Sequence, residues 1–413
     1  MSTRNLRVDG DRLWASLMEM ARIGATEKGG VCRVALTDLD RQGRDLFRRW
    51  CEEAGCTVRV DPMGNMFARR PGRDPSRDPV GTGSHLDSQP TGGKFDGVYG
   101  VLAGLEVVRT LNDRGIETEA PVELCVWTNE EGARFPPAMV GSGVFAGVFS
   151  LDYGHSRADH DGKTQGEELA RIGYLGDAPL GHAFGAYFEA HIEQGPILEN
   201  AGKTIGIVTG AQGTRWYDVI LTGAESHAGP TPMELRRDAM AGAGEILAAL
   251  YRIALDRPPH GRATVGEFRL HPGSRNTVPG RIEFSVDLRH PDGPTLESMD
   301  ADLKALVARV AAARGLEHEV VDIWLSPPVA FDAGCVDAVR KGAAALGHEA
   351  MEVVSGAGHD SVYLSRVAPT GMVFIPCEGG ISHNEVENAT PADVTAGCDV
   401  LLHAMLDRAG VVA

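Results

Sequence analysis

Four short groups of residues carry side chains that could bind a metal ion or move a proton. The first group contains His85 and Asp87, and Asp96 follows among glycines. An imidazole and a carboxylate two residues apart at a strand end can act as metal ligand and orienting group, because the carboxylate fixes the tautomer of the ring. Asp96 could then bridge two ions. Taken singly, these residue types are more typical of turns.

The second group is the carboxylate pair Glu130 and Glu131, which follows the apolar segment 122–126. Neighbouring side chains in an extended segment point in opposite directions, so one could bind metal while the other faces an attacking water as a base. Adjacent glutamates at a strand end also commonly just face solvent. The pair indicates a metal or catalytic site only in combination with the other groups.

The remaining two groups each contribute one imidazole, within the stretches 189–196 and 380–385. A single histidine is more often a surface or core residue than a ligand. Together, however, the four groups supply three imidazoles and two carboxylates, which suits two divalent ions that share an aspartate. The five candidate ligands are His85, Asp96, Glu131, His191 and His383.

With Glu130 beside them, these residues resemble the dinuclear metallo-amidohydrolases of the aminoacylase/carboxypeptidase superfamily. The resemblance is greatest to the branch that contains N-carbamoyl-L-amino-acid hydrolase, β-ureidopropionase and allantoate amidohydrolase. It extends from about Leu13 to Leu406. The stretches that carry it are 83–88, 93–97, 129–135, 191–196, 226–229, 236–238 and 382–384.

The resemblance implies two divalent metal ions per subunit. It assigns the first ion to His85, Asp96 and His191, and the second to Asp96, Glu131 and His383. Donors of this kind fit zinc, manganese, cobalt or nickel about equally.

The resemblance also implies the catalytic groups. Asp87 would orient His85, and Glu130 would be the general base that takes a proton from the attacking water and returns it to the departing nitrogen. A bound divalent ion lowers the pKa of its water to about 7, so hydroxide is available at neutral pH.

Five residues are implied to contact the substrate. His227 would steady the oxyanion in the site of a partner subunit, and the substrate carboxylate would be gripped by Asn276 and Arg289, whose planar fork can pair both oxygens. Gln194 and the backbone of Gly358 would add further contacts. Seen alone, each has an ordinary surface or turn role.

One position departs from the family pattern. The loop after the implied oxyanion histidine often reads His-Ala-Gly-Thr-Thr-Pro in the family, whereas this chain has Pro230 at the first Thr. Proline fixes φ and removes an N–H donor, so the loop would be stiffer and the side-chain specificity stays open.

Helical patterns alternate with short apolar strands along the chain, which predicts a layered α/β fold. A catalytic domain with a mixed sheet flanked by helices would occupy 1–213 and 327–413. An inserted ferredoxin-like βαββαβ domain over 214–326 would serve as lid and dimerisation domain. Its expected elements are strand 216–222, helix 234–255, strands 263–270 and 281–289, helix 296–314 and strand 317–325.

In the catalytic domain, helices are expected over 11–25, 37–53 and 98–114. Strands are expected to end at Ser84, Thr128 and near Ala190. The C-terminal part would add helices over 335–346 and 391–406 around the strand 370–376.

Composition restricts the function further. The chain of 413 residues has 40 Lys and Arg against 57 Asp and Glu, and a net charge of -17 repels nucleic acid and anionic lipid. The seven cysteines form no CxxC pair, which disfavours a disulfide framework and a thiolate zinc site. The polar N-terminus lacks a secretion-signal pattern, so a cytoplasmic protein without nucleic-acid or membrane partners is expected.

The expected activity is hydrolysis of the N-carbamoyl (ureido) group of a small L-amino or β-amino acid, giving ammonia, carbon dioxide and the free amino acid. A homodimer through the inserted domain is expected from the resemblance alone. Allantoate amidohydrolase is the main alternative, and an aminoacylase or dipeptidase is another. A non-catalytic dimeric binding module would have lost ligands, and none is missing here.

Overall fold

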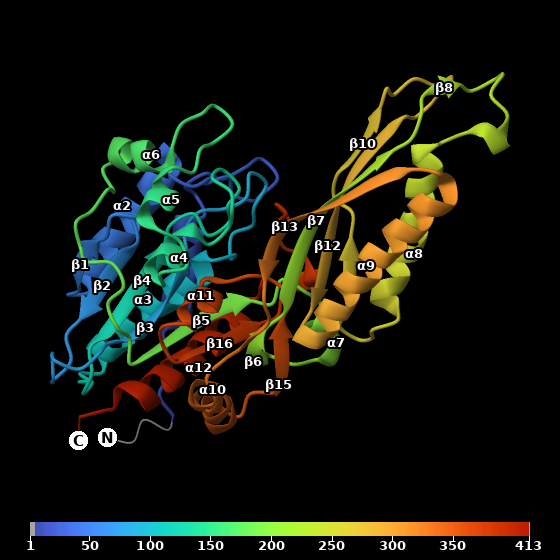
Figure 1. Ribbon diagram of the computed structural model, residues 1–413. Coiled ribbons are helices and arrows are strands. Elements are labelled where there is room, and N and C mark those ends of the chain that lie inside the picture. The colour runs from blue at the N-terminus through green and yellow to red at the C-terminus, as the bar shows by residue number, and fades with distance from the viewer. Residues whose placement is uncertain (1–4, 413) are drawn as a thin grey trace. The chain divides into compact units, whose positions relative to one another are not determined.

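The computed structural model describes residues 5–412 and folds into two compact units (Figure 1). Unit 1 comprises Met1–Thr209 with Ala330–Ala413, and unit 2 comprises Gly210–Val329. The inserted segment expected from the sequence, 214–326, lies within unit 2. Among the residues described, no helix combines the length and the apolar character that crossing a bilayer requires.

Unit 1 is built on a nine-stranded mixed sheet with the order β1-β2-β4-β3-β5-β16-β6-β14, and β15 pairs with β6. The strands are β1 Thr57–Val60, β2 Met66–Arg70, β3 Val80–His85, β4 Val122–Trp127, β5 Ala186–Ile192, β6 Ile205–Ala211, β14 Val329–Ala330, β15 Ala350–Ser355 and β16 Thr370–Ile375. The four central strands β4, β3, β5 and β16 run parallel and are buried along their whole length.

The parallel arrangement gathers the chemically important segments. In the register of the sheet, His85 lies opposite Trp127, and Ile375 lies opposite Ile192. The carboxyl ends of four strands therefore meet at one edge, where open α/β sheets commonly bind ligands. All four groups of candidate residues lie at these ends or just after them.

Helices cover this sheet. α3 (Val98–Asp113) is buried almost throughout and packs with α12 (Pro391–Ala409) against the central strands, while α1 (Gly10–Met20) and α10 (Ala333–Leu346) pack on these helices. The other helices are α2 Asp38–Glu53, α4 Val140–Phe145, α5 Leu151–His155, α6 Gln165–Ile172, α7 Ile197–Ala201 and α11 Asp360–Leu364, with a 3-10 turn η2 at Glu378–Gly380.

The first helix is shorter than expected. It ends at Met20 rather than at residue 25, because the buried Arg33 guanidinium donates to the carbonyls of Met20 at 3.2 Å and Ile23 at 2.9 Å. A side chain that donates hydrogen bonds to these carbonyls replaces the partners that are missing at the end of a helix, so the chain can turn there.

Unit 2 has a five-stranded antiparallel sheet with helices α8 (Ala239–Leu255) and α9 (Gly293–Arg314) packed on it and on each other (Figure 1). The strands are β7 Gly213–Thr222, β9 Arg262–Thr264, β10 Phe268–His271, β12 Arg281–His290 and β13 Glu317–Ser326. A separate two-stranded ribbon pairs β8 (Ser226–His227) with β11 (Thr277–Val278). The expected mixed α/β class and the βαββαβ order are confirmed.

Two details of unit 2 differ from expectation. The strand predicted over 263–270 is two short strands, β9 and β10, which both pair with β12. The helix predicted from residue 234 begins at Ala239, because the Asp238 carboxylate accepts from the N–H groups of Met240 and Ala241 and so caps it there. Before it lies only the 3-10 turn η1 (Met233–Leu235).

A buried ion pair ties α2 to the strand that leads into the glutamate pair. Arg44 and Asp40 are fully buried, 2.9 Å apart, and Arg44 also donates to the Gly64 carbonyl at 2.8 Å and to the Thr128 hydroxyl at 3.3 Å. Removing one member of such a pair leaves the other charge without compensation.

We expect Arg44→Met to lower the apparent free energy of unfolding by about 3–5 kcal/mol. Arg41→Met, on the same helix, removes an exposed pair with Asp45 and should change it by less than about 1 kcal/mol. Urea denaturation of both variants provides the measurement. Equal stability of the two would show that the buried pair does not stabilise the fold.

Candidate active site

Three imidazoles surround the carboxylate of Asp96 at the carboxyl edge of the sheet. Asp96 Oδ1 lies 3.2 Å from His191 Nε2 and 3.4 Å from His85 Nε2, and Asp96 Oδ2 lies 3.5 Å from His383 Nε2. Glu131 Oε2 lies 3.3 Å from His383 Nε2. The five candidate ligands thus converge although they come from four distant parts of the chain.

These contacts form two overlapping groups that could each hold a metal ion. One group is His85, Asp96 and His191, the other is Asp96, Glu131 and His383, and the donor atoms within each lie within 4.8 Å of one another. Their membership is the same as that of the two ligand sets implied by the resemblance.

Backbone carbonyls orient two of the imidazoles. His85 Nδ1 lies 2.9 Å from the Asp87 carbonyl oxygen, and His191 Nδ1 lies 2.8 Å from the Ile192 carbonyl oxygen. A neutral ring that donates from Nδ1 has its lone pair on Nε2, so both Nε2 atoms face Asp96 as acceptors. This is the tautomer that binding a metal through Nε2 requires.

The close approach of His85 depends on Gly97. This residue has φ of +66°, and a Cβ there would stand 2.4 Å from His85 Cε1. A side chain would have to displace the ring and would also strain the backbone. The glycine after Asp96 is therefore required by the site.

Asp87 acts differently from the sequence expectation. Its carboxylate is 3.9 Å from His85 Nδ1, beyond hydrogen-bond distance, so its carbonyl holds the ring instead. The carboxylate accepts from the N–H groups of Glu130 and Glu131, each at 3.3 Å. Asp87 therefore links the histidine segment to the glutamate segment.

The two glutamates both face this cluster. The argument that they point in opposite directions is wrong, because the chain has left β4 and turns at Asn129, which has φ of +58°. Glu130 Oε2 lies 3.4 Å from His85 Nε2, while Glu131 is held by the backbone and side-chain nitrogens of Gln89 at 3.1 and 2.7 Å.

The electrostatics of the cluster favour a cation. Burial and the charge of Asp96 raise the pKa of Glu131 to about 8, and burial raises the pKa of Glu130 well above its usual value. Although burial opposes it, His191 and His85 hold the pKa of Asp96 well below its usual value. Three carboxylates crowded out of water repel each other, and a divalent ion among them would offset that cost. The residues present fit a metal centre.

The structure adds residues that the sequence did not single out. The His359 ring packs edge-on against His191 with 4.6 Å between ring centroids, and its Nε2 lies 2.9 Å from the Ser355 hydroxyl. Burial and the neighbouring His191 hold the pKa of His359 well below its usual value. The sequence had pointed only to the neighbouring residue, Gly358, as a candidate substrate contact.

Gln194 belongs to the same cluster. Its backbone has φ of +59°, and its amide nitrogen donates to Asp96 Oδ2 at 2.8 Å and to the Ser382 hydroxyl at 3.3 Å. Gly358 is exposed, in the loop before α11, and a Cβ there would stand 3.1 Å from Met139 Cε.

In unit 2, the predicted substrate residues fall into two places. His227 and Asn276 are neighbours, because His227 pairs with Thr277 and the Ala228 N–H donates to the Asn276 carbonyl at 2.8 Å. Arg289 lies eight residues beyond Arg281 along β12, about 26 Å away at the rise of a strand. Within unit 2, Arg289 is therefore not brought together with the other two.

The side chains of His227 and Arg289 both present hydrogen-bond donors. The Gly229 N–H donates to His227 Nδ1 at 3.1 Å, so the hydrogen of a neutral ring lies on Nε2 of this exposed side chain. The loop around Pro230 is braced by Arg236, which donates to the carbonyls of Ala228 at 2.7 Å and Thr231 at 3.1 Å. Arg289 is held by Asp287 through contacts of 2.8 to 3.1 Å.

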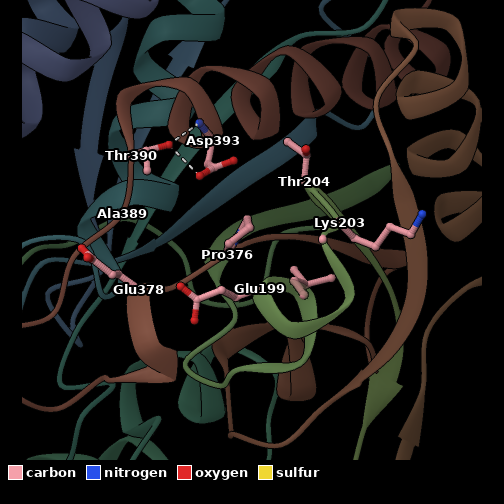
Figure 2. Close-up of a pocket in the computed structure, with 10 residues that line it drawn as sticks. Glu199, Lys203, Thr204, Pro376, Glu378, Ala389, Thr390 and Asp393 are labelled. Carbon is pink, nitrogen blue, oxygen red and sulfur yellow. Dashed lines mark hydrogen bonds between the residues drawn. The ribbon is translucent and has the colours of Figure 1, made fainter.

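A separate cavity of about 390 Å³ opens in unit 1 near the start of α12 (Figure 2). Three carboxylates and one lysine are among its lining, and the Thr390–Asp393 contact seen there is the N-cap of α12. None of the candidate site residues lines it, so it is distinct from the cluster around Asp96.

Comparison with known proteins identifies the family. A model of peptidase family M20/M25/M40 matches residues 81–407. An N-carbamoyl-L-amino-acid amidohydrolase of Rhizobium meliloti is 51% identical over 409 residues, covering 99% of this chain and 98% of that protein. An allantoate amidohydrolase of Bacillus subtilis (strain 168) is 33% identical, covering 92% and 93%.

Solved structures agree with this assignment. An amidase of the hydantoinase/carbamoylase family from Burkholderia multivorans is 64% identical, with a TM-score of 0.93 and 98% of each chain covered. The resemblance inferred from the motifs is confirmed, and the chain belongs to peptidase family M20/M25/M40.

Proposed function

We propose that the protein hydrolyses the N-carbamoyl group of a small L-amino or β-amino acid, acting in the cytoplasm. The observation that carries the proposal is the convergence of three histidines and a buried glutamate pair on Asp96. The similarity to N-carbamoyl-L-amino-acid amidohydrolases over nearly the whole chain supports the substrate class. One water is consumed, and ammonia, carbon dioxide and the free amino acid are released.

Two divalent ions, when bound by the two ligand groups, would polarise the carbamoyl oxygen and lower the pKa of water. Zinc, manganese, cobalt and nickel all suit the donors. Glu130 accepts a proton from the attacking water and donates it to the departing nitrogen. Burial raises the pKa of Glu130 above its usual value, which favours the protonated form that donates to the departing nitrogen.

The residues proposed to contact the substrate come from both units. Arg289 and Asn276 pair with the carboxylate of the substrate, His227 donates from Nε2 to the developing oxyanion, and Gln194 and the Gly358 backbone add contacts. The Arg289 guanidinium, which Asp287 holds in place, has the planar geometry that pairs with both oxygens of a carboxylate.

We propose a homodimer in which one subunit completes the site of the other. Two residues that bind one small carboxylate must lie within a few ångströms of it, yet Arg289 lies about 26 Å along β12 from Arg281. Arg281 pairs with Thr222 at the end of β7, and the separate ribbon of β8 and β11, where His227 and Asn276 lie, follows that end in the chain. Both groups can reach one small carboxylate if Arg289 comes from one subunit and His227 and Asn276 come from the other. This supports a partner subunit that supplies His227 and Asn276.

The substrate class is tested with a panel of ureido acids. Purified protein supplied with Zn²⁺, Mn²⁺, Co²⁺ or Ni²⁺ should release ammonia from N-carbamoyl-L-amino acids or N-carbamoyl-β-alanine, measured by a coupled ammonia assay. Preferential turnover of allantoate would favour the second candidate, which the 33% identical allantoate amidohydrolase supports. Activity restricted to peptides or N-acetyl amino acids, or no turnover at all, would contradict the proposal.

The role of Glu130 is tested by Glu130→Gln, which retains the shape of the side chain but cannot carry the proton. We expect kcat to fall by about 10²- to 10⁴-fold, with metal content unchanged by elemental analysis. Glu199→Gln, which changes an exposed carboxylate at the separate cavity, should leave both unchanged. Retained turnover in Glu130→Gln would show that another group moves the proton.

The shared site is tested by complementation between subunits. Glu130→Gln and His227→Ala should each be inactive as homodimers. Co-expression should restore up to about a quarter of wild-type activity, because half of the dimers are mixed and each of these has one intact site. No restoration in isolated mixed dimers would show that His227 acts within its own subunit.

A further inference from the structure

We infer that Glu387 is a positioning residue that fixes Asp96 and the His383 segment relative to each other. The inference deepens the proposed function, since it concerns the same pair of cation sites. Glu387 lies four residues after His383, in the segment between η2 and α12, and the residue is 1% exposed. A carboxylate so deeply buried requires strong partners.

Those partners are the backbone of the Asp96 segment. Glu387 Oε1 accepts from the N–H groups of Phe95 at 3.0 Å and Asp96 at 3.1 Å. Charge-assisted bonds of this kind are roughly twice as strong as neutral ones. One carboxylate oxygen therefore anchors the backbone of the residue that both cation groups share.

The second oxygen reaches the side chain of Asp96 through Ser382. The Ser382 hydroxyl oxygen lies 2.9 Å from Glu387 Oε2 and 3.0 Å from Asp96 Oδ2. Its single hydrogen can serve one of these acceptors at a time, so the hydroxyl couples the two carboxylates. Glu387 thus contacts Asp96 at both its backbone and, through one hydroxyl, its side chain.

The chain leaves space for this contact at Gly93. A Cβ at Gly93 would stand 2.1 Å from Glu387 Cδ and from Glu387 Oε1. Real atoms cannot approach so closely, so any side chain at this position would push the carboxylate away from its N–H donors. The glycine before Lys94 is explained by this contact rather than by a turn.

His383 needs such support more than the other ligands do. Its side chain is 51% exposed, whereas those of His85 and His191 are 2% and 1% exposed. Its backbone also has φ of +52°, which costs energy for a residue other than glycine. Packing around the ring therefore holds it less firmly, and the anchored segment must set its distance to Asp96 and Glu131.

The test is the binding of Zn²⁺ and Mn²⁺ to metal-free protein, measured by calorimetry and by metal content after dialysis. Glu387→Ala should weaken binding by about 10- to 100-fold. Glu387→Gln should recover most of that loss, because its amide oxygen can still accept from both N–H groups. Glu385→Ala, two residues away, removes a carboxylate that pairs with Lys28 at 3.6 Å. It is the matched control and should bind like wild type.

Two further variants keep the test decisive if Glu387→Ala does not fold. Gly93→Ala should displace the carboxylate and weaken metal binding in the same direction, and Ser382→Ala should do so to a smaller extent. A purely structural role would lower the melting temperature of the metal-free protein while leaving metal affinity at the wild-type value. Wild-type affinity in the folded variants would overturn the inference.

This measurement is independent of the proposed substrate. If wild-type protein binds the ions but releases no ammonia from ureido acids, the proposed function fails while the role of Glu387 is still measured. If wild-type protein turns over ureido acids and Glu387→Ala retains full metal affinity, only the inference fails.

Discussion

The constraint on which the site depends is the burial of several carboxylates beside one another. Asp96, Glu130 and Glu131 are removed from water at one sheet edge, where lost hydration and, to a smaller extent, mutual repulsion raise the pKa of both glutamates. Imidazoles around Asp96 compensate part of that cost, and divalent ions would compensate more. A polar cluster of this kind is maintained only if the surrounding fold holds every member in place.

The topology of unit 1 meets this requirement with backbone groups. Parallel strands end together, so residues from β3, β4, β5 and the segment after β16 reach one edge. Carbonyls orient His85 and His191, and the Asp87 carboxylate binds the N–H groups of the glutamate pair. Gly97 and Gly93 lack side chains where a Cβ would displace a ligand or its anchor. The metal-binding geometry is thus built from main-chain contacts as much as from side chains.

The structure of unit 2 shows how far apart the predicted substrate residues lie within one chain. Its core between the sheet and the helices α8 and α9 holds an extended antiparallel platform, and the predicted substrate residues lie near opposite ends of it. The proposal that two subunits share each site follows from that separation together with the small size of the substrate.

The residue types, the strand ends that carry them and the α/β order could be predicted from the sequence, because periodicity and turn chemistry are local properties. The sequence therefore predicted the ligand candidates and most elements of both units. It did not predict that Asp87 binds the glutamate backbone, that Glu130 and Glu131 face the same cluster, or that one predicted strand is divided into β9 and β10. It also gave no sign of Glu387, which is 291 residues from Asp96. Contacts at such separations depend on how strands are ordered and packed, and only the tertiary structure decides that.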